Sequence, residues 1–243
     1  MHLRRSIALL FTILMFSCNG DKITGSGNVV TQERNVTGFT GVITNGSTKA
    51  FIRMDSIFAV SVKGYENLLP YLETNVVSGI LQVGFKDNVS VSNDNTELHV
   101  SLPMLDYVQT NGTGDMIVTG DVTGSDHLKA SVNGLANISV EKGSADEFEG
   151  EITGSGNISA LGFQCKNAKV NITGDGDVEI AVSDKLDVTI TGNGNVYYHG
   201  SPQISLNITG NGQVVPKGSQ HEIPEPRLSG IGLRITVFTA RRE

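Results

Sequence analysis

The densest group of carboxylates in the sequence is the run Asp146, Glu147, Glu149 and Glu151. Alternate residues of a β-strand point to the same side, so the three glutamates would share one face. Two carboxylates facing one cleft are what glycoside hydrolysis requires. A solvated strand face has the same spacing, however, and arginines that could hold an anionic substrate are scarce between residues 18 and 215. The run therefore leaves a polysaccharide-active enzyme, a lyase or a glycosidase, as an alternative interpretation only.

The segment Gly174-Asp175-Gly176-Asp177 superficially resembles a calcium-binding repeat. Such repeats recur about every nine residues with an aspartate in each copy. The period here is about 20 residues, and most other copies carry Asn, Ser or Thr, which supply too few of the carboxylates that calcium prefers. The five histidines have no metal-ligand spacing, and the cysteines form no pair suited to zinc. We therefore predict no metal, no cofactor and no catalytic residue.

The N-terminal segment, from position 1 to position 17, predicts an exported protein. Two arginines precede an almost entirely apolar stretch that ends at Phe16, which is typical of a signal peptide and too short to span a bilayer. Ser17-Cys18 follows and resembles the cleavage site of bacterial lipoproteins, so we expect Cys18 to be acylated. Residues 18–27 are polar and glycine-rich, as a tether should be. Acylation of Cys18 would leave Cys165 without a disulfide partner.

Internal repetition is the strongest pattern in the chain. The motif Ile-Thr-Gly-x-Gly-Asn/Asp and its variants recur with a nearly constant spacing between their first glycines. A period of about 20 residues is too short for a helical hairpin and fits one turn of a β-coil. An outlying copy lies at Ile23 to Asn28, and a degenerate one lies at Asn45-Gly46-Ser47. The glycines that we interpret as structural are Gly112, Gly114, Gly134, Gly154, Gly156, Gly174, Gly176, Gly192, Gly194, Gly210 and Gly212.

Residue parity within the repeat predicts strands. Val170, Ile172, Gly174, Gly176 and Val178 share one parity, and polar residues occupy the other. This alternation is typical of a strand with one buried face. Because the glycines have the inward parity, we expect them at tight corners that leave no room for a Cβ. Stacked coils pair in parallel about 4.8 Å apart. The sequence thus predicts an all-β fold, a single-stranded parallel β-helix or β-solenoid with coils of about 18–22 residues.

The rest of the chain is assigned around this repeat solenoid, which we place at residues 106–215. Residues 28–105 also alternate but without a strict period, and we interpret them as a β-rich half that starts and caps the solenoid. Residues 216–243 contain three prolines and then an apolar stretch from Ile231 to Phe238. We expect a disordered tail there. A strand that covers the final coil and a stretch read out of frame are the alternatives.

An ordered set of short motifs resembles a known family. Gly25-Ser26-Gly27-Asn28, Glu66-Asn67-Leu68-Leu69-Pro70-Tyr71 and Leu102-Pro103-Met104-Leu105 precede the serial glycine blocks. Together they are similar to the putative auto-transporter adhesin, head GIN domain family of Bacteroidetes-type lipoproteins, over about residues 25–215. The resemblance implies a β-helix-like fold, a cell-envelope location and no catalytic residues to carry over. Asp55-Ser56-Ile57 resembles the O-glycosylation signal of Bacteroidetes envelope proteins, which makes Ser56 a candidate for modification.

Charge excludes one class of partner. The formal net charge is −7, and acidic residues outnumber basic ones two to one between residues 18 and 215. Nucleic-acid binding needs a basic face, so we predict none. The leading hypothesis is a non-enzymatic outer-membrane lipoprotein that presents its solenoid for adhesion to a glycan or an envelope protein, with homo-oligomers as a further option. A structural envelope component without a specific ligand is the second alternative.

Overall fold

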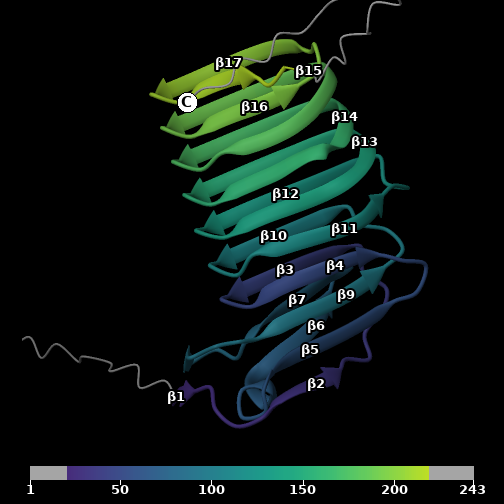
Figure 1. Ribbon diagram of the computed structural model, residues 1–243, viewed down its shortest axis with the longest axis vertical. Coiled ribbons are helices and arrows are strands. Elements are labelled where there is room, and N and C mark those ends of the chain that lie inside the picture. Colours follow the sequence, from purple (N-terminus) through teal and green to yellow (C-terminus); the bar gives the residue numbers. More distant parts are fainter. Residues whose placement is uncertain (1–20, 219–243) are drawn as a thin grey trace, which may run out of the picture.

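The computed structural model describes residues 21–218. They form a nearly all-β structure that winds into a solenoid of about six turns (Figure 1). The predicted all-β solenoid is therefore confirmed. The predicted signal peptide, Cys18 and the tail from residue 219 onward lie outside the described residues.

The strands follow one another along the chain, with one short 3-10 helix, η1, between β5 and β6. Within this described stretch, no helix is long and apolar enough to cross a lipid bilayer. The bounds are β1 (Asp21–Thr24), β2 (Val29–Glu33), β3 (Gly41–Gly46), β4 (Lys49–Met54), β5 (Ala59–Tyr65), η1 (Leu69–Tyr71), β6 (Leu72–Val77), β7 (Ile80–Phe85), β8 (Val89–Ser92), β9 (Glu97–Leu102), β10 (Tyr107–Gly112), β11 (Met116–Val122), β12 (His127–Gly134), β13 (Asn137–Gly154), β14 (Asn157–Gly174), β15 (Val178–Gly192), β16 (Asn195–His199), β17 (Gln203–Gly210) and β18 (Gln213–Pro216).

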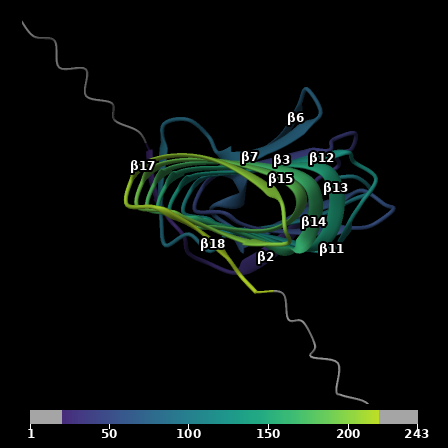
Figure 2. The same ribbon diagram turned by 90° about the horizontal axis from the view of Figure 1, so that it is seen from above.

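From β10 onward, each coil stacks in parallel on the coil before it. One side of the stack follows the order β10, β12, β13, β14, β15 and β17. Equivalent positions of the repeat lie beside one another, as Ile152, Ile172 and Ile190 do. Seen along the stack, the coils superimpose as a flattened ring (Figure 2). The period of the repeat is thus the length of chain that completes one turn.

The interior of the solenoid is filled by the apolar residues of one parity. Val170, Ile172 and Leu186 are at most 1% exposed. Burying an aliphatic side chain of this size stabilises the fold by about 1.5–3 kcal/mol relative to leaving it in water. One coil cannot bury such a row alone, because each residue is covered by its equivalents in the coils on both sides. Stability therefore depends on the stack.

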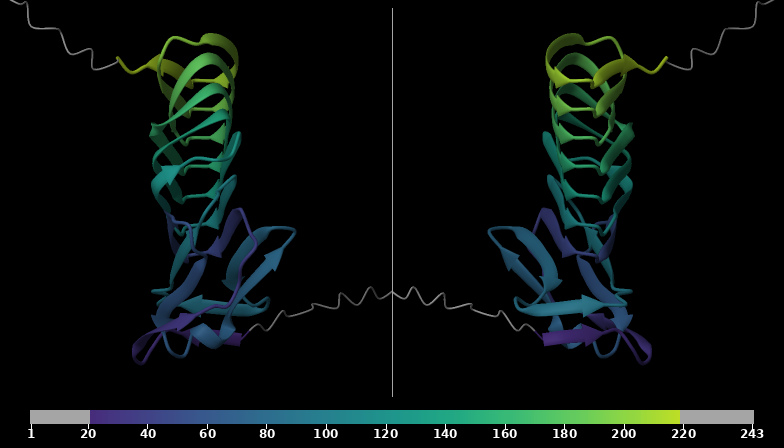
Figure 3. Two further views of the ribbon diagram at one scale, coloured as in Figure 1. Left: turned by 90° about the vertical axis from the view of Figure 1, so that its right-hand side faces the viewer. Right: turned by 90° about the vertical axis from the view of Figure 1, so that its left-hand side faces the viewer.

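The first half of the described chain departs from a regular coil. β3 and β4 pair in parallel with β10 and β11, and Asn45-Gly46 lies beside Asn111-Gly112. The first coil therefore begins before residue 106, within the segment that we interpreted as starting and capping the solenoid. Around it, β2, β5 and β9 pair antiparallel, as do β6 and β7. These crossing strands close one end of the stack (Figure 3).

The segment predicted as a tether is partly a strand. β1 pairs in parallel with β8, with Ile23 beside Val91. The side-chain amides of Asn67 and Asn93 hold the strand's end, because they donate to the carbonyl oxygens of Thr24 at 2.8 Å and Gly25 at 2.7 Å. The copy of the motif at the start of the chain therefore does not form a coil of the solenoid, and it lies against the closed end instead.

Candidate binding groove and the glycine corner

The repeat glycines line one corner of the stack. The first glycine of a motif ends its strand with a positive φ, which is +129° at both Gly154 and Gly174. A Cβ built on Gly174 would collide with the carbonyl oxygen of Gly154, and one on Gly176 would collide with that of Gly156. Backbone packs on backbone along this corner, so it offers a ligand no opening. The other glycines that meet a carbonyl oxygen of the preceding coil in this way are Gly112, Gly114, Gly134, Gly154, Gly156, Gly192, Gly194, Gly210 and Gly212.

The polar residues beside this corner bind one another. The side-chain amide of Asn157 donates to Oδ1 of Asn137 at 2.9 Å, and the backbone N–H of Asp177 donates to Oδ1 of Asn157 at 2.9 Å. Asp177 in turn accepts from the side-chain amide of Asn195 at 2.9 Å. Each side chain thus ties its own coil to the next. Within residues 21–218, no group of three or more His, Cys, Asp or Glu side chains could hold a metal ion.

The acidic run lies on the outer face of β13, where lysines of neighbouring strands contact it. Nζ of Lys129 lies 2.8 Å from Glu151 and 3.5 Å from Glu149, and Lys169 lies 3.7 Å from Glu149. Partial burial alone would lower the pKa of Lys129, but its hydrogen bond to Glu151 and the charge of Glu149 raise the pKa above its usual value. Glu149 and Glu151 are therefore ion-paired with lysines, whereas the two carboxylates of a glycosidase face a sugar ring across a cleft.

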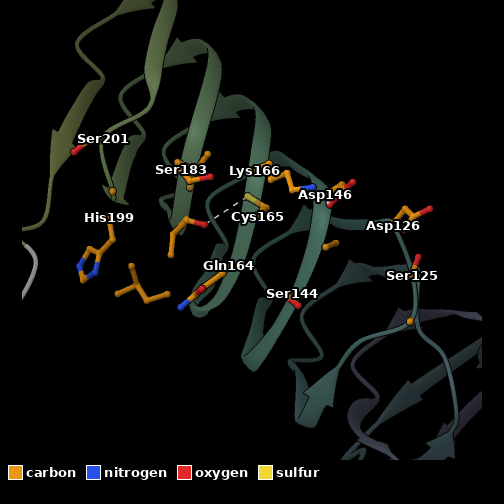
Figure 4. A pocket seen from close by; sticks show the side chains of 16 residues that line it. Ser125, Asp126, Ser144, Asp146, Gln164, Cys165, Lys166, Ser183, His199 and Ser201 are labelled. Carbon is orange, nitrogen blue, oxygen red and sulfur yellow. Dashed lines mark hydrogen bonds and ion pairs between the residues drawn. The ribbon is translucent and has the colours of Figure 1, made fainter.

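A groove of about 960 Å³ runs along a different corner of the solenoid (Figure 4). It crosses five successive coils, each of which contributes a group of three adjacent residues. These groups are 124–126, 144–146, 164–166, 181–183 and 199–201, and Leu161 completes the lining. Because the coils repeat about every 4.8 Å, the groove extends for roughly 20 Å. That length suits an extended chain, such as several sugar rings or a short peptide strand, more than a compact small molecule.

The floor of the groove is formed by small residues with little chemistry. Ala145, Cys165 and Val182 lie beside one another in register. Cys165 is only 5% exposed, and burial raises the pKa of its thiol to about 12. A thiol with this pKa stays protonated near neutral pH and is a poor nucleophile. Cys165 therefore serves as a packing residue.

The sides of the groove carry hydrogen-bonding groups. Ser144 and Gln164 lie beside one another in register on one side of the floor, and Ser125, Ser183, His199 and Ser201 add polar side chains from the other three coils. Charged groups also line the groove, where Lys166 forms an exposed ion pair of 2.8 Å with Asp146. The groove residues do not recur at a constant spacing in the sequence. The reason is that the register between β14 and β15 shifts after Ala160 and again after Cys165. Aligning the repeats on their glycines would still have placed these positions near one another.

Ser56 lies in the turn between β4 and β5, away from the glycine corner. The residue is exposed, and Ile57 beside it is 70% exposed. Oγ of Ser56 lies 3.4 Å from Oδ1 of Asp55, which also pairs with Arg53 at 2.6 Å. A modifying enzyme could reach the hydroxyl in this turn. Glycosylation of Ser56 stays a prediction.

Several solved structures share this fold. A putative adhesin from Bacteroides fragilis NCTC 9343 superimposes with a TM-score of 0.64 at 20% identity, covering 80% of this chain and 100% of that one. A putative adhesin from Parabacteroides merdae gives a TM-score of 0.51 at 22% identity, with 82% and 100% covered. A putative lipid binding protein from Parabacteroides distasonis gives 0.51 at 24% identity, with the same coverage. Identities this low indicate a common fold alone.

The family is assigned by comparison of the sequence. None of the curated proteins compared with the chain matches it. A family profile described as "Putative auto-transporter adhesin, head GIN domain" matches residues 38–202, which is more than half of the chain. That match includes most of the stacked coils and all five groups of groove residues. The predicted resemblance is confirmed: the chain belongs to the putative auto-transporter adhesin, head GIN domain family.

Proposed function

We propose that this protein is a non-enzymatic cell-envelope adhesin that holds an extended glycan along the groove. The main observation behind the proposal is that five successive coils each contribute at least one polar side chain to the groove, among them Ser144, Gln164 and Ser183. Hydroxyl and amide groups donate and accept hydrogen bonds alike, which suits a ligand made of repeating hydroxylated units. Membership of an adhesin family supports a location at the cell surface or in the envelope. An envelope protein with an extended polar segment is the other ligand to consider.

Membrane attachment belongs to the same proposal. Acylation of Cys18 would anchor the chain just before β1, and β1 lies at the closed end of the stack (Figure 1). The coils stack away from this end (Figure 3). Five of them line the groove. An anchored protein of this shape would hold its groove clear of the lipid surface, where a large glycan or a partner could reach it.

A polysaccharide-active enzyme is the competing function. The contacts around Glu149 and Glu151 weigh against it, because Lys129 lies within 3.5 Å of both carboxylates. The two functions are separated by incubating the chain from residue 19 onward with a panel of polysaccharides and envelope proteins. We expect retention on one of them without any reducing-end or unsaturated product. Saturable turnover that is lost in Glu149→Gln or Glu151→Gln would establish the enzyme instead.

A structural envelope component without a ligand would give neither retention nor turnover in that assay. If the chain is retained, a second comparison shows whether the groove is the binding surface. The retention of the unmodified chain is compared with that of a variant whose groove is filled. Gln164→Trp places a large side chain at an exposed position in the middle of the groove. Loss of retention in this variant would support a binding groove, and equal retention would move the binding surface elsewhere.

A further inference from the structure

The last coil exposes an apolar face. All eight residues of β17 are exposed, including Ile204 at 41%, Leu206 at 53% and Ile208 at 37%. These three side chains have the parity that points inward in every earlier coil of the stack. Neighbouring apolar residues exposed together on one strand are uncommon on a soluble surface and indicate a missing contact.

The equivalent residues one coil earlier show what is missing. Leu186, Val188 and Ile190 of β15 lie beside Ile204, Leu206 and Ile208 and are at most 2% exposed. The two rows differ little in chemistry, so the difference comes from their neighbours. β15 is covered by β14 on one side and β17 on the other, whereas β17 pairs with β15 alone among the described strands. An additional strand at the free edge of β17 would complete the row.

The two ends of the solenoid differ in whether other strands cover them. At the first end, β2 and β5 cross antiparallel and η1 packs Leu69 into the core at 1% exposure. At the last end, the final described strand, β18, ends at Pro216, and β17 keeps an open strand edge (Figure 1). Repeat proteins need caps at both ends, because an open edge with apolar side chains invites aggregation.

The chain itself contains a segment that matches this edge. Between residues 231 and 238 the sequence reads Ile-Gly-Leu-Arg-Ile-Thr-Val-Phe, with Ile231, Leu233, Ile235 and Val237 on one parity. The segment is eight residues long, as is β17. The intervening residues 219–230 can span about 40 Å when extended, which exceeds the roughly 26 Å length of an eight-residue strand. The segment can therefore reach either end of β17.

We propose that residues 231–238 pair with β17 and close the open end of the solenoid. Ile231, Leu233 and Ile235 would then cover Ile204, Leu206 and Ile208 as the next coil would in the middle of the stack. Arg234 and Thr236 would face outward, as polar residues of that parity do in the lower coils. The proposal concerns an intramolecular surface and is independent of what the groove binds.

Hydrogen exchange of the full chain tests this pairing strand by strand. Amides of β17 should be protected in the full chain, and Ile235→Lys should lower that protection by about tenfold or more. Thr236→Lys is the matched control, since it places the same charge on the outward parity and should leave β17 protected. Amides of β14 and β15, followed in the same samples, verify that the rest of the solenoid stays folded.

Two results would overturn the proposal. The first is β17 exchange that is equally fast in the full chain and in Ile235→Lys, which would mean that the segment does not cover the edge. The second is protection that survives Ile235→Lys and rises with protein concentration. That result would identify a second copy of the chain, pairing through β17, as the occupant.

Discussion

The carbonyl oxygen of Gly154 accepts a hydrogen bond of 3.0 Å from the backbone N–H of Asp175 in the following coil. A Cβ on Gly174 would occupy the space in front of the same oxygen. The contact repeats one coil further on, where Gly174 accepts from Asn193 at 3.0 Å. The glycine of the repeat is therefore required by the hydrogen bond that joins successive coils, in addition to its positive φ.

This relationship predicts that Gly174→Ala is strongly destabilising. The positive φ alone costs about 1–2 kcal/mol for alanine. The collision with Gly154 should add about 1–3 kcal/mol, because backbone cannot move aside as a side chain can. Gly124→Ala is the control, since Gly124 also has a positive φ, +86°, but nothing lies within 4 Å of its Cβ position. Urea unfolding of both variants should separate the two costs, and equal losses of stability would contradict the packing argument.

The side-chain ladder beside the corner should depend on an acceptor rather than on charge. Oδ1 of Asp177 accepts from the backbone N–H of Asn195 at 2.7 Å and from its side-chain amide at 2.9 Å. Asp177→Ala removes both bonds and should reduce the free energy of unfolding by about 1–2 kcal/mol. Asp177→Asn keeps the acceptor and should be nearly neutral. A large loss in both variants would indicate that the charge itself stabilises the corner.

Reactivity of Cys165 offers a test of the groove floor. With a pKa of about 12, only roughly one thiol in ten thousand is ionised at pH 8. A Cys18→Ser variant leaves Cys165 as the single thiol. We expect iodoacetamide to label it many times more slowly in the folded chain than in denaturant, with the rate rising as the pH is raised. Rapid labelling of the folded chain at pH 8 would show that the floor opens.

The repeat made most of the fold predictable. Parity placed Gly174 and Gly176 inward, and the structure has both at a corner where only glycine fits. The antiparallel pairs among residues 28–105 were not predicted, because alternation identifies a strand but not the direction of its partner. Nor was the pairing of β1 with β8, which brings together segments that are distant in the sequence and share no motif.

The candidate site was less accessible from the sequence. The members of the acidic run are close in sequence, which predicted a possible site, whereas the lysines that pair with them, Lys129 and Lys169, come from other coils. Lys129, Glu149, Lys169 and Asp187 occupy one column of the stack and can be found by aligning the repeats. The groove depends on where the coils turn and on shifts of register, and residue types alone do not specify either.

The membrane anchor can be tested apart from the fold. If Cys18 is acylated, the chain should fractionate with membranes and should be released by Cys18→Ala. Each buried methylene of an acyl chain contributes about 0.8 kcal/mol, so loss of the lipid should remove most of the attachment. Cys165→Ala is the control, because this residue is buried in the solenoid and should not affect fractionation. Continued anchoring of Cys18→Ala would contradict the lipoprotein assignment.

The central claim is that the groove across five coils binds an extended glycan. Its most direct test is the affinity of the chain from residue 19 onward for the glycan retained best in the panel, measured by titration calorimetry. Gln164→Trp should weaken binding by about tenfold or more, since it fills the middle of the groove. Thr173→Trp, exposed near the glycine corner of the same strand, should bind as the unmodified chain does. Unchanged affinity in Gln164→Trp, or an equal loss in both variants, would contradict a binding site in this groove.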